Sequence, residues 1–155
     1  MTWEEYATEV KRTIPNLTLE EMTRHGKLGL VAEVGEVHAI FQKVYQGKPV
    51  DPEKLKDELG DVVWFATEIA ISAEATLSWP ETEVTKVPDT LSSMAWVTGI
   101  ISLQGNKEPY LRLNLNDVLR YVGNVALAYG WTFQEVIDYN VQKLRQRYPN
   151  GFQVK

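Results

Sequence analysis

The 155-residue chain contains no cysteine, so disulfide bonds, cysteine-ligated zinc sites and thiol nucleophiles are excluded. It also lacks a basic surplus: 16 Lys and Arg residues face 21 Asp and Glu residues, for a net charge of -5, which disfavours general binding to nucleic acid. The most apolar stretch, 62–73, is interrupted by Glu68 and is too short to cross a bilayer. The acidic start does not resemble a secretory signal. We therefore expect a cytoplasmic protein that has small-molecule or protein partners and no membrane partner.

The residues that are present predict one all-α domain over 1–155. Apolar residues make up 44% of the chain and charged residues 24%, which is an ordinary globular balance. All seven prolines fall at breaks between segments of helical periodicity. Thr18 with Glu21 and Thr132 with Glu135 are typical capping boxes at helix starts. The expected helices are 2–13, 18–45, 52–76, 90–104, 114–129 and 132–148. A long loop is expected over 77–89, with a short extended piece at 83–87.

Two acidic pairs repeat along the chain. The segment Glu33-Val34-Gly35-Glu36 recurs as Glu58-Leu59-Gly60-Asp61. Each pair has carboxylates three residues apart, so both project from one side of a helix. Both pairs lie at the same edge of the apolar stripe of their helix. Matched placement of this kind indicates a shared site rather than two solvated surfaces.

The spacing of the two pairs predicts how they meet. Residues 46–51 form a connection short enough to force an antiparallel helix hairpin. Glu36 and Glu58 are equally far from Gly47, and so are Glu33 and Asp61. Positions equidistant from the turn lie at about the same height, so Glu36 is expected to face Glu58, and Glu33 to face Asp61.

Four converging carboxylates repel one another, and a bound divalent cation would remove that repulsion. Ligands that offer only oxygen favour Mg²⁺ or Mn²⁺ over zinc. A carboxylate-bridged di-iron site needs a Glu-x-x-His motif on each of two helices, and neither His25 nor His38 lies three residues after a glutamate. Gly35 and Gly60, between the acids, are expected to permit close approach of the two helices.

The ordered set of acids resembles the metal motif of MazG-type nucleoside triphosphate pyrophosphohydrolases. These belong to the all-α NTP pyrophosphatase superfamily, together with dimeric dUTPases and phosphoribosyl-ATP pyrophosphohydrolase. The resemblance covers roughly 20–72 and 130–152, and it includes the final segment 140–149. One departure is Ala32, where many relatives carry a further glutamate.

The resemblance implies Mg²⁺-dependent hydrolysis of a (deoxy)nucleoside triphosphate to the monophosphate and pyrophosphate, with Mn²⁺ as a substitute ion. It implies that four acids are both metal ligands and catalytic residues: Glu33, Glu36, Glu58 and Asp61. It also implies substrate contacts from three residues of the last helix: Asn140, Lys143 and Arg147. A homo-oligomer, either a dimer or a tetramer, is expected.

Several alternatives stay open. Lys143 and Arg147 also fit a cationic last turn that offsets the helix dipole. A catalytically dead helical module that binds a nucleotide or a protein is an alternative function, and an enzyme acting on phosphoribosyl-ATP is another. Trp64 and Trp96 are interpreted as packing or interface residues.

The segment 90–129 has two interpretations. It can be aligned with the acidic hairpin, and the four acid positions then become Trp96, Gly99, Asn114 and Asp117, again symmetric about a turn. On this hypothesis it is a degenerate second hairpin that keeps the packing without the metal. The alternative is an unrelated helical insertion.

Overall fold

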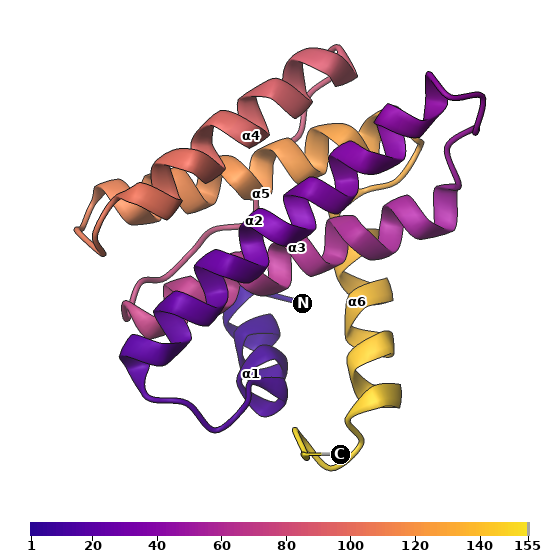
Figure 1. Cartoon of the computed structure of the whole chain (residues 1–155). Helices are drawn as coiled ribbons and strands as arrows, with labels where there is room; N and C mark the ends of the chain where they lie inside the picture. The colour runs from indigo at the N-terminus through magenta and orange to yellow at the C-terminus, as the bar shows by residue number, and fades with distance from the viewer. Residues whose placement is uncertain (155) are drawn as a thin grey trace.

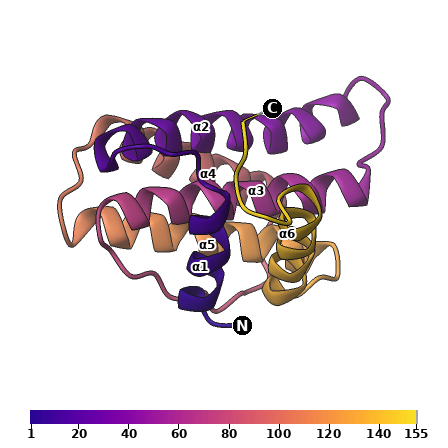
Figure 2. The same cartoon turned by 90° about the horizontal axis from the view of Figure 1, so that it is seen from below.

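The computed structural model describes residues 1–154, which form six α-helices and no strand. The helices are α1 (Trp3–Thr13), α2 (Leu19–Val44), α3 (Pro52–Ser72), α4 (Val87–Leu103), α5 (Tyr110–Ala128) and α6 (Phe133–Arg147). Helices α2 to α5 lie roughly alongside one another, and α1 and α6 cross them steeply on one side (Figure 1, Figure 2). The all-α prediction is confirmed.

Local capping explains where most helices begin. The side chains of Thr18 and Thr132 accept hydrogen bonds from the third amide of α2 and of α6, and the glutamates there complete both capping boxes. Asp51 caps α3 ahead of Pro52, whose fixed φ suits the first helical position. These starts are the ones that the sequence predicts.

The ends of three helices differ from the prediction. Helix α3 stops at Ser72 rather than near residue 76, because the chain turns through Glu74 in a left-handed conformation (φ 56°). Helices α4 and α5 begin earlier than expected, at Val87 and Tyr110, each beside a proline, a residue that the first turn of a helix tolerates. The loop therefore covers 73–86, and the extended piece expected at 83–87 is not a strand.

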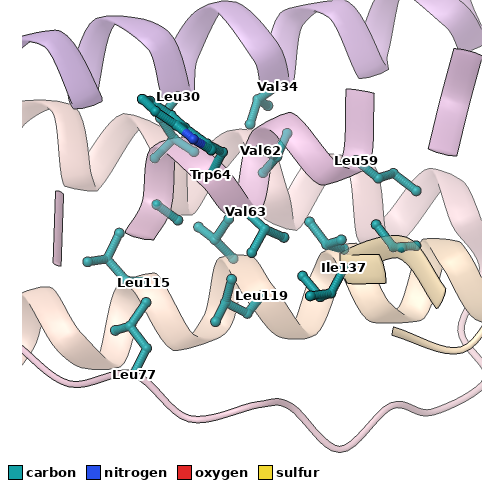
Figure 3. Close-up of a cluster of buried hydrophobic side chains, with 14 of the residues drawn as sticks. Leu30, Val34, Leu59, Val62, Val63, Trp64, Leu77, Leu115, Leu119 and Ile137 are labelled. Atoms are coloured by element: carbon teal, nitrogen blue, oxygen red, sulfur yellow. The ribbon is translucent and has the colours of Figure 1, made fainter. Parts of the chain in front are cut away.

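Helix α3 is the centre of the packing. It contacts α1, α2, α5 and α6, and its second half is apolar on nearly every side, as expected for a buried helix. Figure 3 shows its side chains between those of α2 and α5, with Ile137 of α6 nearby. A set of fully buried residues from four elements makes up this core: Leu30, Leu59, Val62, Val63, Leu115, Leu119 and Ile137.

Close approach of α2 and α3 depends on glycines other than the expected ones. A Cβ on Gly29 would lie 2.0 Å from the Phe65 ring, and one on Gly26 would lie 2.7 Å from Ile69. Gly35, by contrast, has no heavy atom within 4 Å of such a Cβ, and Gly60 packs against Asn140 of α6. The expectation that Gly35 and Gly60 bring the two helices together is therefore wrong.

Candidate metal and phosphate site

Three of the four predicted acids converge where α2 and α3 run side by side. One carboxylate oxygen each from Glu33, Glu58 and Asp61 lies within 4.8 Å of the other two. All three side chains are half-buried. Glu36, one turn further along α2, is exposed and lies outside this group. Glu33 therefore interacts with Glu58 as well as with its expected partner Asp61.

The acid group is electrostatically costly without a cation. Burial, a hydrogen bond with Glu58 and the charge of Asp61 together raise the pKa of Glu33 to about 9. The other oxygen of Glu33, Oε2, is buried and has no hydrogen-bond partner among residues 1–154. A buried acceptor without a donor is unfavourable. A divalent cation would satisfy this oxygen, and an oxygen-only ligand set suits Mg²⁺ or Mn²⁺.

Lys143 of α6 faces the acids on α3. Its Nζ donates to Asp57 Oδ1 at 2.6 Å and to Asp61 Oδ1 at 2.5 Å. Burial lowers the pKa of Lys143, but the two aspartates outweigh that effect and the net pKa is raised. Burial likewise raises the pKa of Asp61, which Lys143 only partly offsets. The cluster thus combines closely spaced carboxylates with one nearly buried ammonium group.

Asn140 of α6 holds the Asp61 carboxylate through a hydrogen bond. Its amide donates to Asp61 Oδ1 at 3.3 Å, and its carbonyl oxygen accepts from the Tyr6 hydroxyl at 2.7 Å. The Asn140 side chain is fully buried and lies 3.0 Å from the position of a Cβ on Gly60. Any larger residue at position 60 would push Asn140 away. In this arrangement Asn140 and Tyr6 fix the orientation of one carboxylate of the acid group.

A cavity of about 270 Å³ opens beside the cluster. Asp61 and Lys143 stand at its polar end, and the exposed Arg147 lies one turn beyond Lys143. Most of the remaining wall is aromatic, formed by His25, Trp64, Phe65, Tyr148 and Phe152. The cavity thus has part of the acidic cluster and two cationic side chains in its wall, and its aromatic side chains leave space that suits a flat ring.

Asp57, Tyr6 and the pair His25–Glu68 also belong to this region and were not predicted from the sequence. Asp57 had a weak sequence signal: it precedes Asp61 by one helical turn, and two like charges at that spacing are mildly destabilising unless a cation lies nearby. No sequence signal indicated Tyr6 or Glu68, since each forms its hydrogen bond with a residue far away in the chain. His38 lies outside the cavity and bridges α2 to α4, with its ring nitrogens 2.8 Å and 2.9 Å from the carbonyl oxygens of Val34 and Leu91.

No family model matches this chain, and the searches of curated proteins and of solved structures gave no significant match either. Within residues 1–154, no helix has the length and apolar character that crossing a membrane requires.

Proposed function

We propose that this protein is a Mg²⁺-dependent hydrolase that converts a (deoxy)nucleoside triphosphate to the monophosphate and pyrophosphate. One observation carries the proposal: Glu33, Glu58 and Asp61 converge within 4.8 Å of one another, and Asp61 and the nearly buried Lys143 line an adjacent cavity with aromatic walls. Carboxylates for a metal ion, a cation for phosphate and a slot for a ring are the three parts that such a substrate needs.

The chemistry follows from the donors. Glu33, Glu58 and Asp61 would hold Mg²⁺, with Glu36 on the exposed continuation of the same edge of α2. A bound Mg²⁺ supplies charge neutralisation at the phosphates and lowers the pKa of a bound water. Lys143 and Arg147 would bind phosphate oxygens, while Asn140 holds Asp61 in place. The oxygen of water bonds to the α-phosphorus, the bond from that phosphorus to the bridging oxygen breaks, and pyrophosphate leaves.

The protonation state of Glu33 supports a role in proton transfer in addition to metal binding. Its raised pKa means that the site holds a proton before the metal arrives, and metal binding would expel it. Glu33 would hold Mg²⁺ through one carboxylate oxygen, which leaves its other oxygen to accept the proton of the attacking water. We therefore assign Glu33 as the candidate general base among the four acids.

Product analysis tests the proposal directly. The protein is incubated with Mg²⁺ and a panel of nucleoside and deoxynucleoside triphosphates, and the products are separated. We expect monophosphate and pyrophosphate in equal amounts, and no product when the Mg²⁺ is chelated. Release of inorganic phosphate and a diphosphate would contradict the proposal. Phosphoribosyl-ATP belongs in the same panel, because a preference for it would identify the related activity instead.

A specific observation favours one second candidate, a catalytically inactive binding module. Lys143 already neutralises part of the cluster through Asp57 and Asp61, so the acids could be a structural ion-pair network. The two candidates differ in their response to metal. If Mg²⁺ binds the assembled site, millimolar Mg²⁺ raises the melting temperature, and Glu33→Gln combined with Asp61→Asn abolishes that shift. An inactive ion-pair network shows no shift in either protein.

The proposal includes a homo-oligomer acting in the cytoplasm, where nucleoside triphosphates and Mg²⁺ are available. Support comes from exposed apolar side chains around a shallow groove between α2 and α4. Val31 and Leu103 line this groove with 47% and 89% of their surface exposed, and Trp96, 70% exposed, lies two turns before Leu103 on α4; contiguous exposed apolar surface of this kind marks interaction sites. Sedimentation analysis tests it: a dimer or tetramer is expected, and Trp96→Glu should shift the population toward monomer.

A further inference from the structure

The cavity beside the metal site has a polar end and an aromatic end, and the aromatic end is rigid. Trp64 and Phe65 meet edge to face with their ring centres 4.9 Å apart. The Trp64 indole nitrogen donates to Thr13 Oγ1 at 3.0 Å, which fixes its rotamer. Phe65 fills the space above Gly29, where a Cβ would lie 2.0 Å from the ring. This wall is therefore formed before any ligand binds.

A second part of the wall comes from the segment after α6. Tyr148 and Phe152 pack with ring centres 6.2 Å apart. The segment is tied to α1, because the Arg12 guanidinium donates to the Tyr148 carbonyl and the Phe152 amide donates to the Arg12 carbonyl. Aromatic side chains from both parts of the chain thus line a space of about 270 Å³. That volume lies below the roughly 300–1,000 Å³ of pockets that enclose a whole drug-sized ligand, so it suits a ring rather than a complete triphosphate.

One polar side chain stands among these rings. His25 Nδ1 lies 2.7 Å and 2.9 Å from the two carboxylate oxygens of Glu68. The Glu68 side chain is fully buried, whereas that of His25 is 41% exposed. Burial raises the pKa of Glu68, and His25 partly offsets the shift. A buried carboxylate that makes its hydrogen bonds to a histidine fixes the ring orientation and leaves Nε2 as the free polar atom.

We propose that this cavity holds the base of the nucleoside triphosphate, and that His25, oriented by Glu68, hydrogen-bonds the edge of the base through Nε2 and so determines which bases are accepted. The inference rests on the proposed function, since Asp61 and Lys143 at the polar end define where the phosphates lie. Flat aromatic walls bind every base by stacking. Discrimination among bases then requires a hydrogen-bonding group, because apolar contact alone discriminates weakly.

Selectivity measurements test His25. The values of kcat/KM are compared for triphosphates of the four DNA bases in wild type and in the double variant His25→Leu with Glu68→Gln. Leucine keeps apolar contact with Phe65 and removes Nε2, and glutamine avoids a buried unpaired charge. We expect the ratio between the best and the worst base to fall at least tenfold. His38→Gln is the matched control, since it replaces a partly buried histidine of α2 outside the cavity, and it should keep the wild-type ratio.

Glu68 is a positioning residue in this proposal, and the same ratio tests it. Glu68→Ala should lose selectivity while kcat on the best substrate stays within a few-fold of wild type, and Glu68→Gln, which still accepts from Nδ1, should restore the ratio. Loss of kcat without loss of selectivity would indicate a structural role alone and would contradict the assignment.

A measurement on the wild-type protein keeps the proposal testable if these variants do not fold. The imidazole resonances of His25 are followed by NMR while nucleoside monophosphates are added, with ribose 5-phosphate as the ligand that lacks a base. We expect shifts with the monophosphates and none with ribose 5-phosphate. Equal shifts with both, or an unchanged ratio in a folded double variant, would overturn the base-reading role while leaving the hydrolase standing. Absence of turnover on every triphosphate would overturn the hydrolase, and this inference with it.

Discussion

The acidic hairpin, formed by α2 and α3, and the second hairpin, formed by α4 and α5, pack in the same way but differ in what their matched side chains contact. Each is a pair of helices packed along its length, and α2 also contacts α4 while α3 contacts α5. In the acidic hairpin three carboxylates converge beneath Lys143. In the second hairpin, Asp117 pairs with Arg120 of its own helix at 2.9 Å.

The other matched positions of the second hairpin do not converge on a site either. Trp96 is 70% exposed, and Gly99 has no heavy atom within 4 Å of an added Cβ. Asn114 donates to Gln104 at 3.2 Å. Among the described residues the two hairpins therefore differ in two respects: the acidic hairpin alone has acids at all four matched positions, and it alone pairs with Lys143 of α6. Helix α6 contacts α3 and α5 but not α4 among the described residues, and it supplies Lys143 to the acidic hairpin alone.

The largest expected contrast is between two tryptophans. Trp64 is 9% exposed and hydrogen-bonded to Thr13, so Trp64→Ala should lower the free energy of unfolding by about 3–5 kcal/mol. Trp96→Ala removes an exposed ring and should change it by about 0.5 kcal/mol or less. Urea denaturation of both variants, at a concentration at which sedimentation shows a monomer, measures the two effects. A large loss for Trp96→Ala would show that its ring is covered within the monomer.

The second contrast concerns catalysis. Glu58→Gln should lower Mg²⁺-dependent turnover more than a hundredfold, because replacing a metal ligand should cost more than the 10- to 100-fold typical of an outer-shell partner. Asp117 of the second hairpin aligns with Asp61 and serves as the control. Asp117→Asn should leave turnover unchanged. Steady-state rates with Mg²⁺ and the preferred triphosphate provide the measurement. A Mg²⁺-dependent loss in Asp117→Asn would mean that the second hairpin contributes to the site.

Glu36→Gln sharpens this second contrast within the acidic hairpin. Glu36 is exposed and lies outside the carboxylate group, so its replacement should reduce turnover less than that of Glu58. Equal losses in the two variants would show that Glu36 joins the site once metal and substrate are bound.

Two glycines give the third contrast. Gly29→Ala would place a Cβ 2.0 Å from the Phe65 ring, so it should destabilise the protein by about 1–3 kcal/mol through overpacking. Gly99→Ala meets open space and should stabilise the protein by up to about 1 kcal/mol through helix propensity. Thermal and urea unfolding measure both. A neutral Gly29→Ala would indicate that Phe65 moves aside freely, and the rigid cavity wall would then be wrong.

The last expected effect is a pH dependence of stability that belongs to the acidic hairpin. Because the pKa of Glu33 is raised to about 9, the folded protein holds a proton that the unfolded chain releases near pH 4.5. The free energy of unfolding without metal should therefore fall as pH rises from about 5 to 9, by at most about 1.4 kcal/mol per pH unit. Urea titrations at several pH values measure the slope, and Glu33→Gln should flatten it. An equal slope in that variant would assign the proton to another group.

The fold could be predicted from the sequence because its signals are local. Capping residues, prolines and helical periodicity lie within a few positions of what they determine, and the starts of α2, α3 and α6 agree. The boundary of α3 failed because the turn at Glu74 has no glycine to mark it. The glycine prediction failed for another reason: periodicity indicates which edge of a helix is buried, but not where along that edge two helices come closest.

The candidate site could be predicted only in part. The meeting of Glu33 with Asp61 follows from symmetry about Gly47. The exposure of Glu36 could not be predicted from that symmetry, because the rotation of α2 about its axis is set by packing against α4 as well as α3. Partners such as Tyr6 for Asn140 and Glu68 for His25 join elements distant in sequence, and single residue types carry no signal of their three-dimensional neighbours.

The long sequence separation between Asp61 and Lys143, 82 residues, has a consequence for the order in which the protein assembles. During synthesis the acidic hairpin emerges from the ribosome well before α6. Its carboxylates then lack their ammonium partner, and the segment that ties Tyr148 to Arg12 across 136 residues is not yet made. The hairpin can form early from local contacts, whereas closure of the cavity must wait for the last helix. A nascent chain that stops short of residue 143 therefore carries the carboxylates of the acidic hairpin without the ammonium group that pairs with Asp57 and Asp61 in the complete fold.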